Sequence, residues 1–121
     1  MIAEDEPSIL ESLEFLMRNA GYEIRSVRDG DLAAACLAEF HPHLLLLDVM
    51  LPGKSGLEIC RLLRADPQQA GTRVLMLTAK GGRIDATIAA DSGADEYLAK
   101  PFSTRELLAR VKALLANGAS R

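Results

Sequence analysis

Short apolar runs alternate along the chain with longer segments of helical periodicity. The runs 44–47 and 74–77 are apolar at every position, as is typical of central parallel strands that helices cover on both faces. Shorter runs at 2–3, 24–27 and 97–99 predict three further strands. The pattern therefore predicts strands separated by helices over the whole length of the chain.

The segments between these runs carry the end signals of helices. Pro7 suits a first helical turn, and Gly21 suits the stop that follows a helix. Ser55 and Glu58 have the spacing of a capping box, as has the run 103–106. The expected helices cover about residues 7–20, 31–40, a segment that begins after Ser55, 83–92 and 103–116.

Five repeats of a strand followed by a helix place the chain in the α/β class. Right-handed crossovers between such units give a doubly wound parallel sheet with helices on both faces. Ligand sites in these sheets lie beyond the carboxyl ends of the strands. Residues that end the strands are therefore the first candidates for function.

Composition narrows the class of protein. The 121 residues fit one domain, and 49% hydrophobic with 26% charged residues is ordinary for a globular protein. A net charge of −3 argues against a nucleic-acid surface, and no apolar run approaches the ~18 residues of a membrane span. Cys36 and Cys60 lie in helical apolar patterns, which favours buried thiols in a reducing cytoplasm.

Polar residues end four of the predicted strands. The acids 4–6 follow the first strand, Asp48 ends the third, Thr78 the fourth and Lys100 the fifth. Each alone is better explained as a solvated charge or a strand-end cap, but together they would converge on one edge of the sheet. Clustered carboxylates repel one another unless they share a proton or bind a cation, and oxygen ligands without His or Cys favour Mg²⁺. A lysine and a threonine hydroxyl beside them suit phosphoryl oxygens.

Four segments carry a resemblance to a known family. Residues 4–7, 47–53, 76–79 and 93–102 read EDEP, LDVMLPG, MLTA and GADEYLAKPF, and they resemble the motifs of response regulator receiver domains in order and spacing. The resemblance covers the whole chain, residues 1–121. It implies a (βα)5 flavodoxin-like receiver with strand order 2-1-3-4-5.

The resemblance also implies roles at the strand ends. Asp48 would accept a phosphoryl group from a histidine kinase. Glu4, Asp5, Asp48 and the backbone carbonyl of Met50 would hold Mg²⁺, with Glu4 acting through water. A receiver is not an enzyme for outside substrates, because it catalyses only its own phosphorylation and slow self-dephosphorylation.

Switching is expected to involve the last two strands. Thr78 and Lys100 would grip the phosphoryl oxygens, and Tyr97 would rotate inward as Thr78 moves toward the phosphate. The bond before Pro101 is expected to be cis. The surface formed by the fourth helix, fifth strand and fifth helix would then control an output, and Met50 with the Lys-Pro-Phe-Ser run resembles receivers of winged-helix transcriptional regulators.

Homodimerisation through that surface is left open. Glu96, Glu106, Arg110 and Lys112 match the charge pattern that receivers of this kind use, but segment 84–90 lacks the basic residues of the partner helix. We expect no direct nucleic-acid binding by this domain, no membrane contact and a cytoplasmic location. Residues 117–121 resemble the start of a linker, so an effector domain after about residue 117 is a further expectation.

Two other classes of function compete with this interpretation. A Mg²⁺-dependent phosphohydrolase of the haloacid dehalogenase type would also use an aspartyl phosphate, but it needs a second aspartate where this chain has Met50. An interaction module without phosphorylation would not need the complete set of acceptor, acids, hydroxyl and lysine.

Overall fold

The computed structural model describes residues 1–78 and 93–119 of the chain. Its five parallel strands have the order β2-β1-β3-β4-β5. The strands are β1 (Ile2–Ala3), β2 (Ser26–Val27), β3 (Leu44–Asp48), β4 (Arg73–Thr78) and β5 (Glu96–Ala99). The helices are α1 (Pro7–Asn19), α2 (Gly30–Glu39), α3 (Gly56–Ala65) and α5 (Thr104–Ala119), with a short 3-10 helix at Pro67–Gln69. The α/β class and the strand order expected from the sequence are both confirmed.

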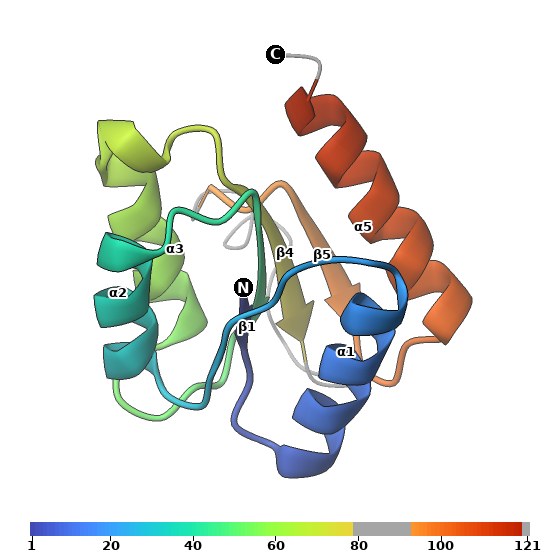
Figure 1. The fold of residues 1–121 in the computed structure, drawn as a ribbon. Coiled ribbons are helices and arrows are strands. Elements are labelled where there is room, and N and C mark those ends of the chain that lie inside the picture. The colour runs from blue at the N-terminus through green and yellow to red at the C-terminus, as the bar shows by residue number, and fades with distance from the viewer. Residues whose placement is uncertain (79–92, 120–121) are drawn as a thin grey trace.

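Alternation along the central strands divides the core into two layers. Leu45 and Leu47 of β3 pack with Val74 and Met76 of β4 in the layer toward α2 and α3. Their neighbours along each strand point to the opposite face and pack in the second layer. Helices α1 and α5 lie on that side of the sheet, and α2 and α3 lie on the other (Figure 1). Both strands are buried throughout, which explains why the sequence shows continuous apolar runs here.

Several element boundaries differ from the expected ones. The strand expected over 24–27 is only Ser26–Val27, because β1 offers two residues with which to pair. Helix α2 begins at Gly30, since the side chain of Asp29 accepts the Leu32 N–H at 2.7 Å and caps it. Helix α5 continues to Ala119, past the point where a linker was expected to begin. The helix expected over 83–92 lies outside the described residues.

End signals read from the sequence are confirmed at the other helices. Pro7 opens α1, and Gly21 after its end has a positive φ of 92°. Ser55 and Glu58 form the reciprocal capping box of α3. In the part of the chain that the structure describes, no helix is long and apolar enough to cross a membrane.

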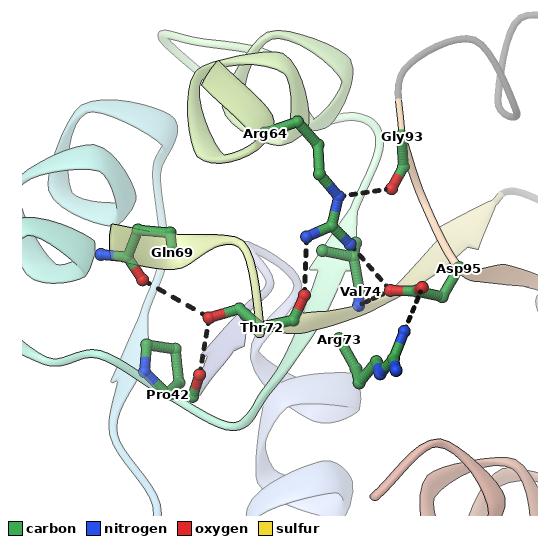
Figure 2. A network of polar contacts seen from close by, with 8 residues as sticks. All are labelled: Pro42, Arg64, Gln69, Thr72, Arg73, Val74, Gly93 and Asp95. Atoms are coloured by element: carbon green, nitrogen blue, oxygen red, sulfur yellow. Dashed lines mark hydrogen bonds and ion pairs between the residues drawn. The ribbon is translucent and has the colours of Figure 1, made fainter. Parts of the chain in front are cut away.

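An arginine network ties α3 to the starts of β4 and β5 (Figure 2). The guanidinium of Arg64 donates to the carbonyls of Gly93 and Thr72, both at 2.7 Å, and to Asp95 at 2.8 Å. Asp95 also accepts from Arg73 at 3.0 Å and from the Val74 N–H at 2.7 Å. The network fixes the residues that lead into β5, at the edge of the sheet opposite Asp48.

Candidate functional site

The parallel register brings the polar strand ends to one edge of the sheet. Asp48 is the last residue of β3 and pairs with Leu77, one residue before Thr78 at the end of β4. Thr78 in turn pairs with Ala99, and its carbonyl accepts the Lys100 N–H at 2.7 Å. The acids that follow β1 lie beside β3, because Ala3 pairs with Leu47.

Three carboxylates meet at this edge. Glu4, Asp5 and Asp48 each offer an oxygen, and these atoms all lie within 4.8 Å of one another. Glu4 is fully buried and Asp48 is 4% exposed, whereas Asp5 is half-buried. Such a cluster of buried negative charge requires a counter-charge.

Lys100 supplies a positive charge within the cluster. Its Nζ lies 2.7 Å from Glu4 Oε1 and 3.6 Å from Asp48 Oδ2. The lysine side chain is 16% exposed, so these pairs are screened little by water. The structure thus brings together four of the residues singled out in the sequence, with Lys100 between the first acid and the expected phosphoacceptor.

The two oxygens of Asp48 have different environments. Oδ1 accepts the Met50 N–H at 3.1 Å, while Oδ2 faces Lys100. Burial raises the pKa of the Asp48 carboxyl above its ordinary value. The Met50 N–H and the Lys100 ammonium oppose this shift in pKa, and the nearby Glu4 reinforces it.

The donor set of this edge fits Mg²⁺. Three carboxylates offer hard oxygen ligands close enough to share one ion, and neither His nor Cys belongs to the cluster. One lysine among three acids leaves the cluster with a net negative charge when all are ionised. A divalent cation would offset that charge.

The remaining expected residues lie on β4, on β5 and in the loops that follow β3 and β5. Thr78 is 8% exposed at the end of β4, and Met50 is 70% exposed in the loop after β3. Tyr97 on β5 is 46% exposed, so its ring faces outward in this structure rather than inward. The Lys100–Pro101 bond is cis, as expected from the sequence.

Charged residues on β5 and α5 pair within the chain. Arg110 contacts Glu96 at 2.6 Å and Glu106 at 3.9 Å. These are residues expected at a dimer interface, and the segment that would face them, 84–90, lies outside the described residues.

Sequence reasoning missed the glycines that border the loop after Asp48. Gly30 and Gly56 both lie where a side chain would overlap backbone atoms of residues 48–54. The sequence signal that could have indicated Gly30 is its position directly after Asp29, which caps the helix. The Arg64 network was missed as well, because its partners are carbonyls that sequence patterns do not mark.

The chain is similar to known proteins in sequence over nearly its whole length. A family model for the response regulator receiver domain matches residues 1–112. The DNA-binding response regulator MtrA of Mycolicibacterium smegmatis is 43% identical over 115 residues, which are 95% of this chain and 49% of that protein. The chain therefore spans about half the length of the curated relatives it matches.

Solved structures share the fold across nearly the full chain. A CheY-like response regulator receiver domain protein from Methanospirillum hungatei aligns with a TM-score of 0.90 at 25% identity, covering 98% of this chain and 94% of that one. The receiver domain of the sensor histidine kinase PA1611 from Pseudomonas aeruginosa aligns with a TM-score of 0.86 at 28% identity, covering 95% and 94%. That second structure is described with a magnesium ion coordinated in its active-site cleft.

Proposed function

The chain belongs to the response regulator receiver domain family, and from this premise we propose that it is a signalling switch phosphorylated on Asp48. The observation that carries the proposal is the cluster of three carboxylates and Lys100 around this buried aspartate. A histidine kinase is the proposed donor of the phosphoryl group, in a Mg²⁺-dependent transfer. The domain would then lie in the cytoplasm, where the ATP that such kinases use is present.

The geometry favours Oδ2 of Asp48 as the attacking oxygen. Oδ1 is held by the Met50 N–H, whereas Oδ2 faces Lys100 across 3.6 Å. Attack on phosphorus forms the O–P bond of an acyl phosphate as the P–N bond to the kinase histidine breaks. The histidine nitrogen keeps the electron pair and takes up a proton.

Lys100 and Thr78 would stabilise the transferred group. The transition state spreads negative charge over three equatorial oxygens, and an ammonium on a largely buried side chain acts on that charge with little screening. The Thr78 hydroxyl, at the end of the neighbouring strand, would donate to one oxygen. Lys100 now pairs most closely with Glu4 at 2.7 Å, so engaging the phosphoryl group would loosen that pair.

Four groups would hold the metal ion: the carboxylates of Glu4, Asp5 and Asp48 and the backbone carbonyl of Met50. Glu4 is fully buried and paired with Lys100, which suits contact through a water molecule. A bound Mg²⁺ would neutralise charge on the phosphoryl oxygens and on the crowded acids.

The proposed output runs through β5 and α5. Tyr97 faces outward in this structure, which is the arrangement expected of an unphosphorylated receiver. Movement of Thr78 toward the phosphate would open space for the ring and rebuild the surrounding surface. The curated relatives are DNA-binding response regulators of about twice this length, so control of transcription by an effector domain is the proposed output.

A phosphohydrolase acting on outside substrates is the second candidate, and Met50 argues against it. This residue is 70% exposed at the position where such an enzyme needs a carboxylic acid. The chain would therefore form its own phosphoaspartate without turning over other phosphomonoesters.

Intact-mass measurement after incubation with a small phosphodonor tests the proposal. Wild type should gain one phosphoryl group in the presence of Mg²⁺, lose it on treatment with hydroxylamine, and gain none with EDTA. The variant Asp48→Asn should gain none under either condition. A fully labelled Asp48→Asn protein would exclude Asp48 as the acceptor, and multiple turnover of a phosphomonoester would favour the hydrolase.

A further inference from the structure

The loop between Asp48 and α3 is held at both of its ends. At its start, the Val49 N–H donates to the Leu77 carbonyl at 3.0 Å and continues the sheet beyond β3. The Gly56 N–H returns to the Val49 carbonyl at 2.9 Å. At its end, the capping box of Ser55 fixes the entry into α3. Residues 50–54, which include the proposed metal ligand Met50, span the interval between these anchors.

Helix α2 touches this interval through its first residue. The buried Gly30 N–H donates to the Pro52 carbonyl at 2.8 Å. A Cβ atom added to Gly30 would lie 1.8 Å from the Lys54 carbonyl oxygen, 2.6 Å from its carbon and 2.7 Å from the Lys54 nitrogen. All three atoms belong to the backbone, so no flexible side chain can move aside to make room.

A displacement of the Lys54 backbone is restrained at both ends of the loop. The capping box restrains the next residue, Ser55, and the sheet restrains Val49. The residues between them would then take up the shift. Met50 is among them, and its N–H holds Oδ1 of Asp48 at 3.1 Å.

We propose that Gly30 is a positioning residue of the phosphorylation site, acting through the loop that it allows to pack against α2. The absence of a side chain at residue 30 sets the position of residues 50–54, and through them the Met50 N–H and carbonyl beside Asp48. This inference rests on the proposed function, because it concerns the same metal and phosphoryl chemistry. It also adds α2 to the elements that govern that chemistry.

The test compares Gly30→Ala with Gly71→Ala. Gly71 is exposed, has nothing within 4 Å of an added Cβ and has no positive φ, so its variant is the matched control. Urea unfolding first establishes that each protein is fully folded under assay conditions. The Mg²⁺ dissociation constant is then measured by calorimetry, and the phosphorylation rate constant at saturating Mg²⁺ by intact mass with a small phosphodonor.

The folded Gly30→Ala variant should be phosphorylated about 10- to 100-fold more slowly, as expected for a displacement approaching 1 Å at a reacting group. Its Mg²⁺ dissociation constant should also rise, while Gly71→Ala matches wild type in both measurements. A purely structural role for Gly30 would lower the free energy of unfolding but leave both constants of the folded protein unchanged. A folded Gly30→Ala protein with wild-type constants overturns the inference.

If Gly30→Ala does not fold, the variant Asp29→Ala tests the positioning role of this part of α2. Asp29→Ala removes the side chain that accepts the Leu32 N–H at 2.7 Å, which loosens the first turn of α2. Slower phosphorylation of this folded variant supports the inference, and a wild-type rate overturns it. If wild type itself takes up no phosphoryl group, the proposed function fails, and Mg²⁺ binding by the same variants still tests the positioning role. Absence of Mg²⁺ binding in wild type would overturn both.

Discussion

At the scale of single residues, the site is organised around Asp48, whose carboxyl burial makes costly to ionise. Glu4 and Asp48 are almost completely buried, and one ammonium serves both. Stored electrostatic repulsion of this kind is released by a cation or by removal of a charge.

Removing the charge at residue 48 should therefore stabilise the protein at neutral pH. Because the folded pKa of Asp48 is raised above the unfolded value of about 3.9, its favourable contribution to stability is complete below the unfolded pKa. That contribution is lost as pH rises through the folded pKa. Asp48→Asn should accordingly unfold at higher urea concentration than wild type at neutral pH in EDTA, and the difference should shrink as pH falls toward 4.

The control for this experiment is Asp31→Asn. Asp31 is 71% exposed and 3.7 Å from Lys54, so its variant should stay within about 0.5 kcal/mol of wild type. A less stable Asp48→Asn protein at neutral pH would show that ionised Asp48 is stabilised by its surroundings.

Replacing Lys100 should lower the free energy of unfolding, which is the opposite of the effect expected for Asp48→Asn. Lys100→Met leaves the fully buried Glu4 carboxylate without its cation and should cost on the order of 3 kcal/mol at neutral pH in EDTA. Urea unfolding measures the change, and Lys54→Met serves as the exposed control with an expected change under about 1 kcal/mol. Equal effects of the two variants would mean that the Lys100 pair contributes no more than a surface pair.

At the scale of elements, sequence patterns predicted β3 and β4 almost to the residue and β2 poorly. The central strands are apolar on both faces, a signal that is hard to mistake for a loop. Strand β2 has partly buried residues and pairs only with the two residues of β1, so its length depends on a partner rather than on its own pattern. The starts of α2 and α3 depend on the capping side chains of Asp29 and Ser55, and the cap predicted from the sequence was that of Ser55.

The Arg64 network should stabilise the join between α3, β4 and β5. Arg64→Met removes hydrogen bonds to two carbonyls and one carboxylate, and should lower the free energy of unfolding by about 2 kcal/mol (Figure 2). Arg61→Met, an exposed arginine on the same helix, should change it by less than about 0.5 kcal/mol in the same urea titration. Similar losses for both variants would argue that Arg64 contributes through its aliphatic stem alone.

At the scale of the whole molecule, the parallel topology explains why the site could be predicted from strand ends. Residues separated by 96 positions, Glu4 and Lys100, meet because consecutive strands direct their carboxyl ends to one edge. The distance between Glu4 and Lys100 could not be predicted, because it depends on the conformations of both side chains. The packing of Gly30 against Lys54 could not be predicted either, because it depends on how α2 sits on the sheet.

Metal binding should couple to the stability of the entire domain. Mg²⁺ that binds only the folded state raises the free energy of unfolding by about 2.7 kcal/mol at a concentration 100 times the dissociation constant. Thermal unfolding with increasing Mg²⁺ should show this rise in wild type, and EDTA should abolish it. Asp5→Asn should weaken the response, and an undiminished response in that variant would remove Asp5 from the proposed ligands.

The most direct measurement is to locate the phosphoryl group on the chain. Borohydride reduces an aspartyl phosphate to homoserine, so treatment after phosphorylation in Mg²⁺ marks the acceptor permanently for peptide mass spectrometry. The account predicts homoserine at residue 48 and unaltered aspartate at residues 5 and 95. Homoserine at another position, or none in a protein that carries a phosphoryl group, would contradict the assignment of Asp48 as the switch.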